Sequence, residues 1–148
     1  MLPSGFFHQG LVSVLHEKLV EAARGRWQVA SQGPLKLSED SLPQPDLLLL
    51  RPSPTRYQDR HALPQDVFLA VEVAETSLAH DRQRKLPLYA RAGLPEVWLF
   101  NLKKRQAEIY REPSFGEYAS KLVLPSTGEL SLLAFPDFSL PLGELFRV

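Results

Sequence analysis

The chain has 148 residues, of which 44% are hydrophobic, 17 are acidic and 17 are basic. This size and apolar content fit one domain over residues 1–148 with a continuous core. The absence of cysteine excludes disulfides, thiolate metal sites and a cysteine nucleophile. No apolar run reaches the ~20 residues that span a membrane, and there is no signal-peptide pattern, so we expect a cytoplasmic protein without membrane contact. Zero net charge argues against a protein that coats nucleic acid, but it leaves a nuclease possible because acidic metal ligands offset basic residues.

The first half of the chain predicts one helix followed by short strands. Leu11, Val14, Leu15 and Leu19 recur at helical spacing, and Gly25 is a plausible stop. The predicted elements are a helix over 9–24, strands over 27–31 and 35–37, a loop over 39–45, a buried strand over 46–50 and a surface loop over 51–65.

The second half alternates strand, helix and strands. Val67, Leu69, Val71 and Val73 are predicted to face one way in a strand, and the residues between them the other way. The predicted elements are strands over 67–74, 96–101, 107–111, 118–124 and 130–133, a helix over 78–92 that Pro87 should kink and Gly93 should cap, and a closing helical turn over 141–146. This order predicts a mixed α/β sheet flanked by helices.

Glu72 requires a partner, because it interrupts a strand whose neighbours are nearly all apolar. Burying an unpaired carboxylate costs several kcal/mol. Asp46 begins another strand of the same expected sheet, so the two carboxylates are predicted to converge. Paired carboxylates suit Mg²⁺ or Mn²⁺, and such a metal activates water and stabilises charge on a phosphodiester.

Two structural interpretations compete with a metal site. Asp46 follows Pro45, a pattern that also suits the cap of a turn. Glu72 would equally be satisfied by a salt bridge to an arginine such as Arg82.

Several motifs in order resemble a known family. They are Pro45-Asp46, Val71-Glu72-Val73, Lys85 with Tyr89 in the second helix, and the passage from Ala92 to Trp98; residues 3–10 also resemble the family's approach to its first helix. The chain resembles, almost throughout, the Uma family of putative restriction endonucleases, a bacterial domain of unknown function within the PD-(D/E)XK superfamily. The resemblance implies a restriction-endonuclease-like fold. Tyr89 and Trp98 are expected to be core residues.

The same resemblance implies a catalytic site. Asp46 and Glu72 carry over as metal ligands, and the Val73 carbonyl adds a third oxygen. The superfamily places a lysine two residues after the glutamate, where this chain has Ala74. Family members often supply that charge from the following helix, where Lys85 matches; the alternative is an ordinary solvated lysine. The family's usual segment before the first helix is also missing, so we expect an uncovered sheet edge or one that a partner chain completes.

The remaining candidates are accessory. His8 matches a family histidine and is expected near the site or as a structural histidine. Glu17 is a possible first-helix carboxylate, and Gln83 a possible phosphate contact. The basic residues of the second helix suit a DNA backbone, although such runs usually face solvent; they are Arg82, Arg84, Lys85 and Arg91.

Two functions follow from this pattern. The first is a Mg²⁺-dependent endonuclease that hydrolyses DNA phosphodiesters, and by analogy with nucleases of this fold we expect a homodimer that cuts both strands. The second is a catalytically silent module of the same fold that dimerises or binds nucleic acid. Ala74, the neutral charge and the interrupted helix favour the second.

Overall fold

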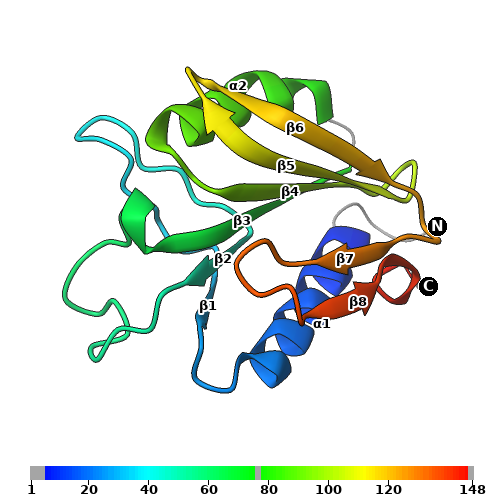
Figure 1. The fold of residues 1–148 in the computed structure, drawn as a ribbon, viewed down its shortest axis with the longest axis horizontal. Coiled ribbons are helices and arrows are strands. Elements are labelled where there is room, and N and C mark those ends of the chain that lie inside the picture. Colours follow the sequence, from blue (N-terminus) through cyan, green and yellow to red (C-terminus); the bar gives the residue numbers. More distant parts are fainter. Residues whose placement is uncertain (1–5, 76–77, 147–148) are drawn as a thin grey trace.

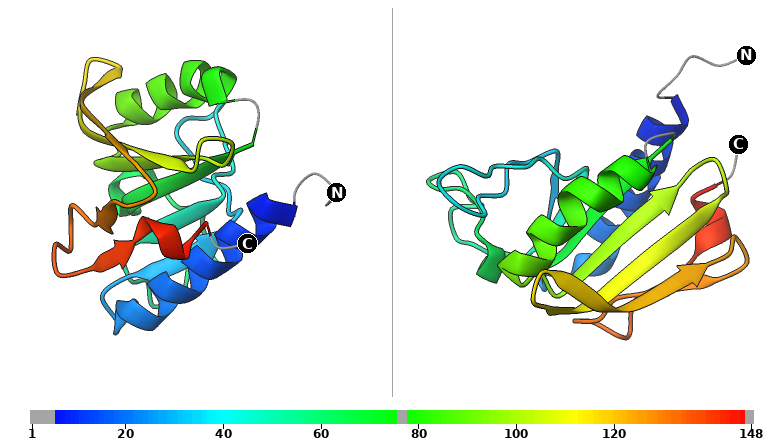
Figure 2. Two further views of the ribbon diagram at one scale, coloured as in Figure 1. Left: turned by 90° about the vertical axis from the view of Figure 1, so that its right-hand side faces the viewer. Right: turned by 90° about the horizontal axis from the view of Figure 1, so that it is seen from above.

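The computed structural model describes residues 6–75 and 78–146. A six-stranded sheet in the order β1-β2-β3-β4-β5-β6 separates two layers, as Figure 1 and the side view in Figure 2 show. Helix α2 covers one face, and α1 with the β7–β8 hairpin covers the other. The elements are α1 (Phe6–Ala23), β1 (Gln28–Ser31), β2 (Leu47–Leu50), the 3-10 helix η1 (Pro64–Asp66), β3 (Val67–Ala74), α2 (Leu78–Ala92), β4 (Glu96–Asn101), β5 (Gln106–Ser114), β6 (Glu117–Leu124), β7 (Glu129–Ser131), β8 (Ser139–Pro141) and the 3-10 helix η2 (Leu142–Glu144).

Strand order follows chain order, and all neighbours in the large sheet are antiparallel except β3 and β4. A parallel pair needs a crossover, and α2 is that crossover. It packs over β4, β5 and β6. The mixed sheet with flanking helices confirms the predicted fold class.

The face beneath α1 is almost wholly apolar. Leu11, Leu15 and Leu19 of α1 are buried against alternate residues of the central strands and against the β7–β8 segment. Trp98 and Phe100 lie in this layer in edge-to-face contact. Burial of large apolar side chains on this scale supplies the main driving force for folding.

The face beneath α2 holds a smaller apolar core that surrounds charged groups. Tyr89 and Leu94 are buried there, and Tyr89 and Trp98 are both core residues as expected. Helix α2 continues through Pro87. It ends where Gly93, with φ of 79°, donates to Ala90 and the N–H of Leu94 donates to the Tyr89 carbonyl. Glycine adopts this left-handed conformation without strain, which confirms Gly93 as the cap.

Strand β3, helix α2 and strand β4 have the predicted bounds, but other segments differ. The expected strand over 35–37 is wrong, because Leu35 makes only an isolated bridge to Ala62. Strand β8 was not predicted, since its three residues are too short to show a period. At the start of β3, Val67 and Phe68 exchange faces because the β2–β3 register shifts between Leu49 and Leu50. From Leu69 onward the predicted alternation is correct.

No described helix is both long and apolar enough to cross a membrane.

Candidate active site

Asp46 and Glu72 are brought together by the register of β2 and β3. Leu47 pairs with Val71, so one further step sets Asp46 opposite Glu72. Directly opposite residues of an antiparallel pair point to the same face, with Cβ atoms about 5 Å apart. That face is the one under α2, because Ala70 and Ala74 share it.

Asp46 makes two contacts that orient its carboxylate. Its Oδ2 accepts a hydrogen bond of 2.8 Å from the Val73 N–H. Its Oδ1 lies 3.2 Å from His8 Nε2, which reaches the site from the first turn of α1. Asp46 therefore does more than cap a local turn, since both partners are remote in sequence.

Pro45 explains why an oxygen is available next to Asp46. The Ala74 carbonyl accepts from Leu102 on the β4 side, so the N–H and carbonyl of Val73 point the other way, toward β2. The next strand position opposite Val73 is Pro45, which has no N–H. Strand pairing therefore provides no N–H donor for the Val73 carbonyl. This oxygen points toward β2, on the same side of β3 as Asp46.

Glu72 is paired with Lys85. The Glu72 residue is 3% exposed, yet it lies mid-strand. Lys85 Nζ is 2.6 Å from its Oε2 and 3.2 Å from its Oε1. The lysine reaches inward from α2, so it is not an ordinary solvated lysine. The proposed salt bridge between Glu72 and Arg82 is wrong.

Arg82 instead pairs with Glu108, a residue that the sequence analysis missed. Arg82 Nε donates to Glu108 Oε1 at 2.6 Å, and its terminal nitrogen pairs with Oε2. The Tyr110 hydroxyl donates to the same Oε1 at 2.5 Å. Burial raises the pKa of Tyr110, which keeps this donor protonated. The signal was present, because Glu108 interrupts an apolar strand just as Glu72 does.

Glu72 and Glu108 belong to one row across the sheet. Glu72 pairs with Leu99 on β4, and Leu99 pairs with Glu108 on β5. Asp46 extends the row on the β2 side. Each of the three carboxylates contacts a cationic or titratable side chain. Asp46 contacts His8, Glu72 contacts Lys85, and Glu108 contacts Arg82.

The basic residues of α2 do not form one strip. Arg82 and Lys85, three positions apart, turn toward the sheet. Arg84 and Arg91, seven positions apart, are exposed; Arg84 contacts His80, and Arg91 lies against Gly116 in the β5–β6 turn. The second pair is exposed, whereas Arg82 and Lys85 are partly buried against the carboxylates of the sheet.

Of the two other accessory candidates, the structure describes the side chain of Glu17 alone. Glu17 is exposed in an open groove between α1 and β1, and His8 also lines this groove. Gln83 lies in α2, but its side chain is outside the described part of the structure.

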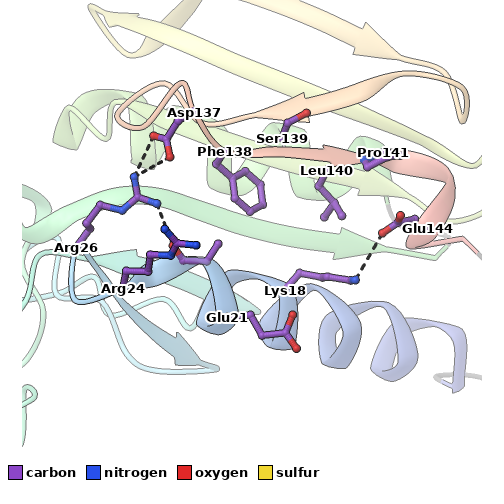
Figure 3. Close-up of a pocket in the computed structure, with 11 residues that line it drawn as sticks. Lys18, Glu21, Arg24, Arg26, Asp137, Phe138, Ser139, Leu140, Pro141 and Glu144 are labelled. Atoms are coloured by element: carbon purple, nitrogen blue, oxygen red, sulfur yellow. Dashed lines mark hydrogen bonds and ion pairs between the residues drawn. The ribbon is translucent and has the colours of Figure 1, made fainter.

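A second hollow, between α1 and β8, carries no comparable chemistry. Figure 3 shows two ion pairs across the groove, Arg26 with Asp137 and Lys18 with Glu144. Arg26 also donates to the Ala22 and Ala23 carbonyls. This arrangement caps α1 and ties it to the C-terminal hairpin.

The donor chemistry at Asp46 and Glu72 fits a hard divalent cation. Two carboxylates on adjacent strands and a carbonyl without a ladder partner are oxygen ligands of the kind that Mg²⁺ and Mn²⁺ take. Among the described residues, no three His, Asp or Glu side chains converge, so the third protein oxygen would be Val73. Water commonly completes the coordination of Mg²⁺.

Comparison with protein families identifies the family of this chain. Residues 1–143 match the model of the Uma2 family, described as "Putative restriction endonuclease". The chain belongs to this family. A crystal structure of a putative nuclease of the DUF820 family from Anabaena variabilis matches with a TM-score of 0.74 at 13% identity, over 99% of this chain and 83% of that one. At this identity the match shows the shared fold. No protein of curated function matches.

Proposed function

We propose that the protein is a divalent-metal-dependent endonuclease that hydrolyses DNA phosphodiester bonds at Asp46 and Glu72. The proposal rests on the β2–β3 register, which continued by one residue sets Asp46 opposite Glu72, and on the contact between Lys85 and Glu72. The family's description and the nuclease-fold neighbour support the reaction class.

Asp46, Glu72 and the Val73 carbonyl would hold Mg²⁺ or Mn²⁺. The bound ion would supply charge stabilisation for the phosphodiester and acidify a water molecule. His8 holds Asp46 Oδ1 and the Val73 N–H holds Oδ2, so the carboxylate is oriented before any ligand arrives. Such preorganisation lowers the cost of assembling the site.

Lys85 takes the place of the lysine that the superfamily motif has where this chain has Ala74. Ala74 lies on the α2 face with Glu72, so a lysine there would project toward the same space that Lys85 enters from the helix. Lys85 is therefore proposed to orient the attacking water and to offset negative charge as it develops on the phosphate.

A second candidate function is a silent module that dimerises or binds nucleic acid. It is favoured by the same contact, because Lys85 bonds to both Glu72 oxygens and would satisfy that carboxylate without a metal. A homodimer is proposed for either function. Strand β6 is an edge of the sheet and exposes Leu122 and Val123, which suits an interface. Light scattering on the purified chain measures the oligomeric state directly.

The deciding experiment is cleavage of supercoiled plasmid with Mg²⁺ or Mn²⁺ by wild type, Asp46→Asn and Glu72→Gln. Metal-dependent nicking that is lost in both variants supports the endonuclease. The matched control is Glu96→Gln, a buried glutamate on the opposite face, which should still cut when folded. A folded wild type that binds DNA but cuts none with either ion supports the silent module.

A further inference from the structure

A second buried carboxylate lies beside the proposed catalytic pair. The Glu108 side chain is only 5% exposed, and three donors from two residues converge on its two oxygens. Replacing a buried ion pair with apolar residues is often neutral or stabilising, so stability alone is a weak reason for this arrangement. What the arrangement does achieve is a fixed orientation for Arg82.

The geometry leaves part of the Arg82 guanidinium available. Its Nε and one terminal nitrogen engage Glu108 side-on, as in a bidentate pair. The side chain remains 35% exposed. Solvent therefore reaches part of this side chain, one helical turn from Lys85.

We propose that Glu108 and Tyr110 are positioning residues that orient Arg82 to bind a DNA phosphate. This phosphate would lie on the same strand as the scissile phosphate at Asp46 and Glu72 and would flank it. The inference rests on the proposed function for its ligand, a DNA backbone. Glu72 and Glu108 are two strand spacings apart, roughly 10 Å. Lys85 and Arg82 thus mark two points along the row, where they could contact different phosphates of one strand. A planar guanidinium matches phosphate oxygens better than an ammonium does.

The test is binding of the full chain to a fluorescently labelled DNA duplex, without divalent metal, over a range of NaCl concentrations. Arg82→Ala should weaken binding about tenfold. It should also lower the slope of log affinity against log salt by about one, as expected for one lost phosphate contact.

Glu108→Gln gives the sharper result because two explanations predict opposite signs. If Glu108 only neutralises Arg82, Glu108→Gln should increase the affinity for DNA, because it removes a negative charge from the face that contacts the DNA. A positioning role predicts weaker binding, roughly fivefold, because a neutral amide holds the guanidinium less firmly. Glu96→Gln makes the same charge change on the opposite face and should leave DNA affinity unchanged.

Arg82→Lys is the second variant if Glu108→Gln does not fold. It keeps the charge and should weaken binding with little change in salt slope, since only the fork geometry is lost. Unchanged affinity in Arg82→Ala, or tighter binding in Glu108→Gln, would overturn the inference. If Arg82→Ala binds and cuts like wild type, the inference fails while the endonuclease stands; if wild type neither binds nor cuts, both fail.

Discussion

Buried glutamates occur on both faces of the sheet, but they bind different kinds of partner. On the α1 face, Glu96 accepts from Arg111 Nε at 2.7 Å and from the Leu133 N–H at 3.0 Å. Arg111 also donates to the Ser131 carbonyl. These contacts tie the β7 segment to β4 and β5 through its main chain.

On the α2 face, the cationic partners of Glu72 and Glu108 are the ends of side chains from helix α2, and Glu108 also accepts from the Tyr110 hydroxyl of its own strand. A main-chain partner cannot leave without disrupting the fold, whereas a lysine or arginine head group can turn to a ligand. A main-chain donor in addition to an arginine therefore marks Glu96 as a buried charge that holds the fold, whereas Glu72 and Glu108 contact helix side chains that a ligand could displace.

The largest effect is expected from breaking the catalytic pair on the α2 face. Lys85→Met should lower metal-dependent cleavage by ~10²–10³-fold, as is typical when one preorganised electrostatic group is removed. Adding Lys85→Met to Glu72→Gln should cost no further activity, because the glutamate variant already lacks the proposed metal ligand and the two residues act together. Rates come from plasmid nicking, with circular dichroism as the control for folding. Full activity in Lys85→Met would remove that residue from the mechanism.

On the α1 face, the largest effect should be on stability. Leu15 is fully buried in the α1 layer, so Leu15→Ala should lower the free energy of unfolding by about 2–5 kcal/mol. Urea denaturation measures the change. Cleavage per folded molecule should stay the same at a temperature where the variant is folded; a selective loss of activity would show that the two faces are coupled.

Glu96→Gln should produce an intermediate loss of stability, about 1–3 kcal/mol. The amide can still accept from Leu133, but it loses the charge that pairs with Arg111. The same substitution at Glu108 should cost less, because its partner comes from a more exposed helix surface. Thermal denaturation of the two variants side by side tests that order.

The smallest effect concerns an ion pair outside both layers. A hydrogen bond from Arg60, aided by the Leu63 N–H, lowers the pKa of Asp66. Because the folded-state pKa lies below the unfolded value of 3.8, the stabilisation is present above that value and is lost as pH falls through the folded pKa. Wild type should therefore lose more stability than Asp66→Asn on acidification below about pH 4. Parallel acid titrations by fluorescence would show equal losses if the pair contributes nothing.

Much of the local structure could be predicted from residue spacing. The period-two run from Leu69 to Ala74, the Gly93 cap and the apolar β4 strand are local patterns, and the structure has them at the predicted residues. Glu72 stood out because a carboxylate in such a strand must find a partner. The same reasoning applied to Glu108 would have found that residue too.

The sequence by itself therefore determined most of the helices and strands, and it showed which buried charged residue, Glu72, needs a partner. Tertiary structure alone decided the partners. Spacing along the chain could not show that His8 meets Asp46, that Lys85 takes Glu72 or that Arg82 turns to Glu108. Those choices depend on strand register and on how α2 lies across the sheet, both of which are set by packing between residues far apart in the chain. Short segments such as β8 likewise exist only because a neighbouring strand pairs with them.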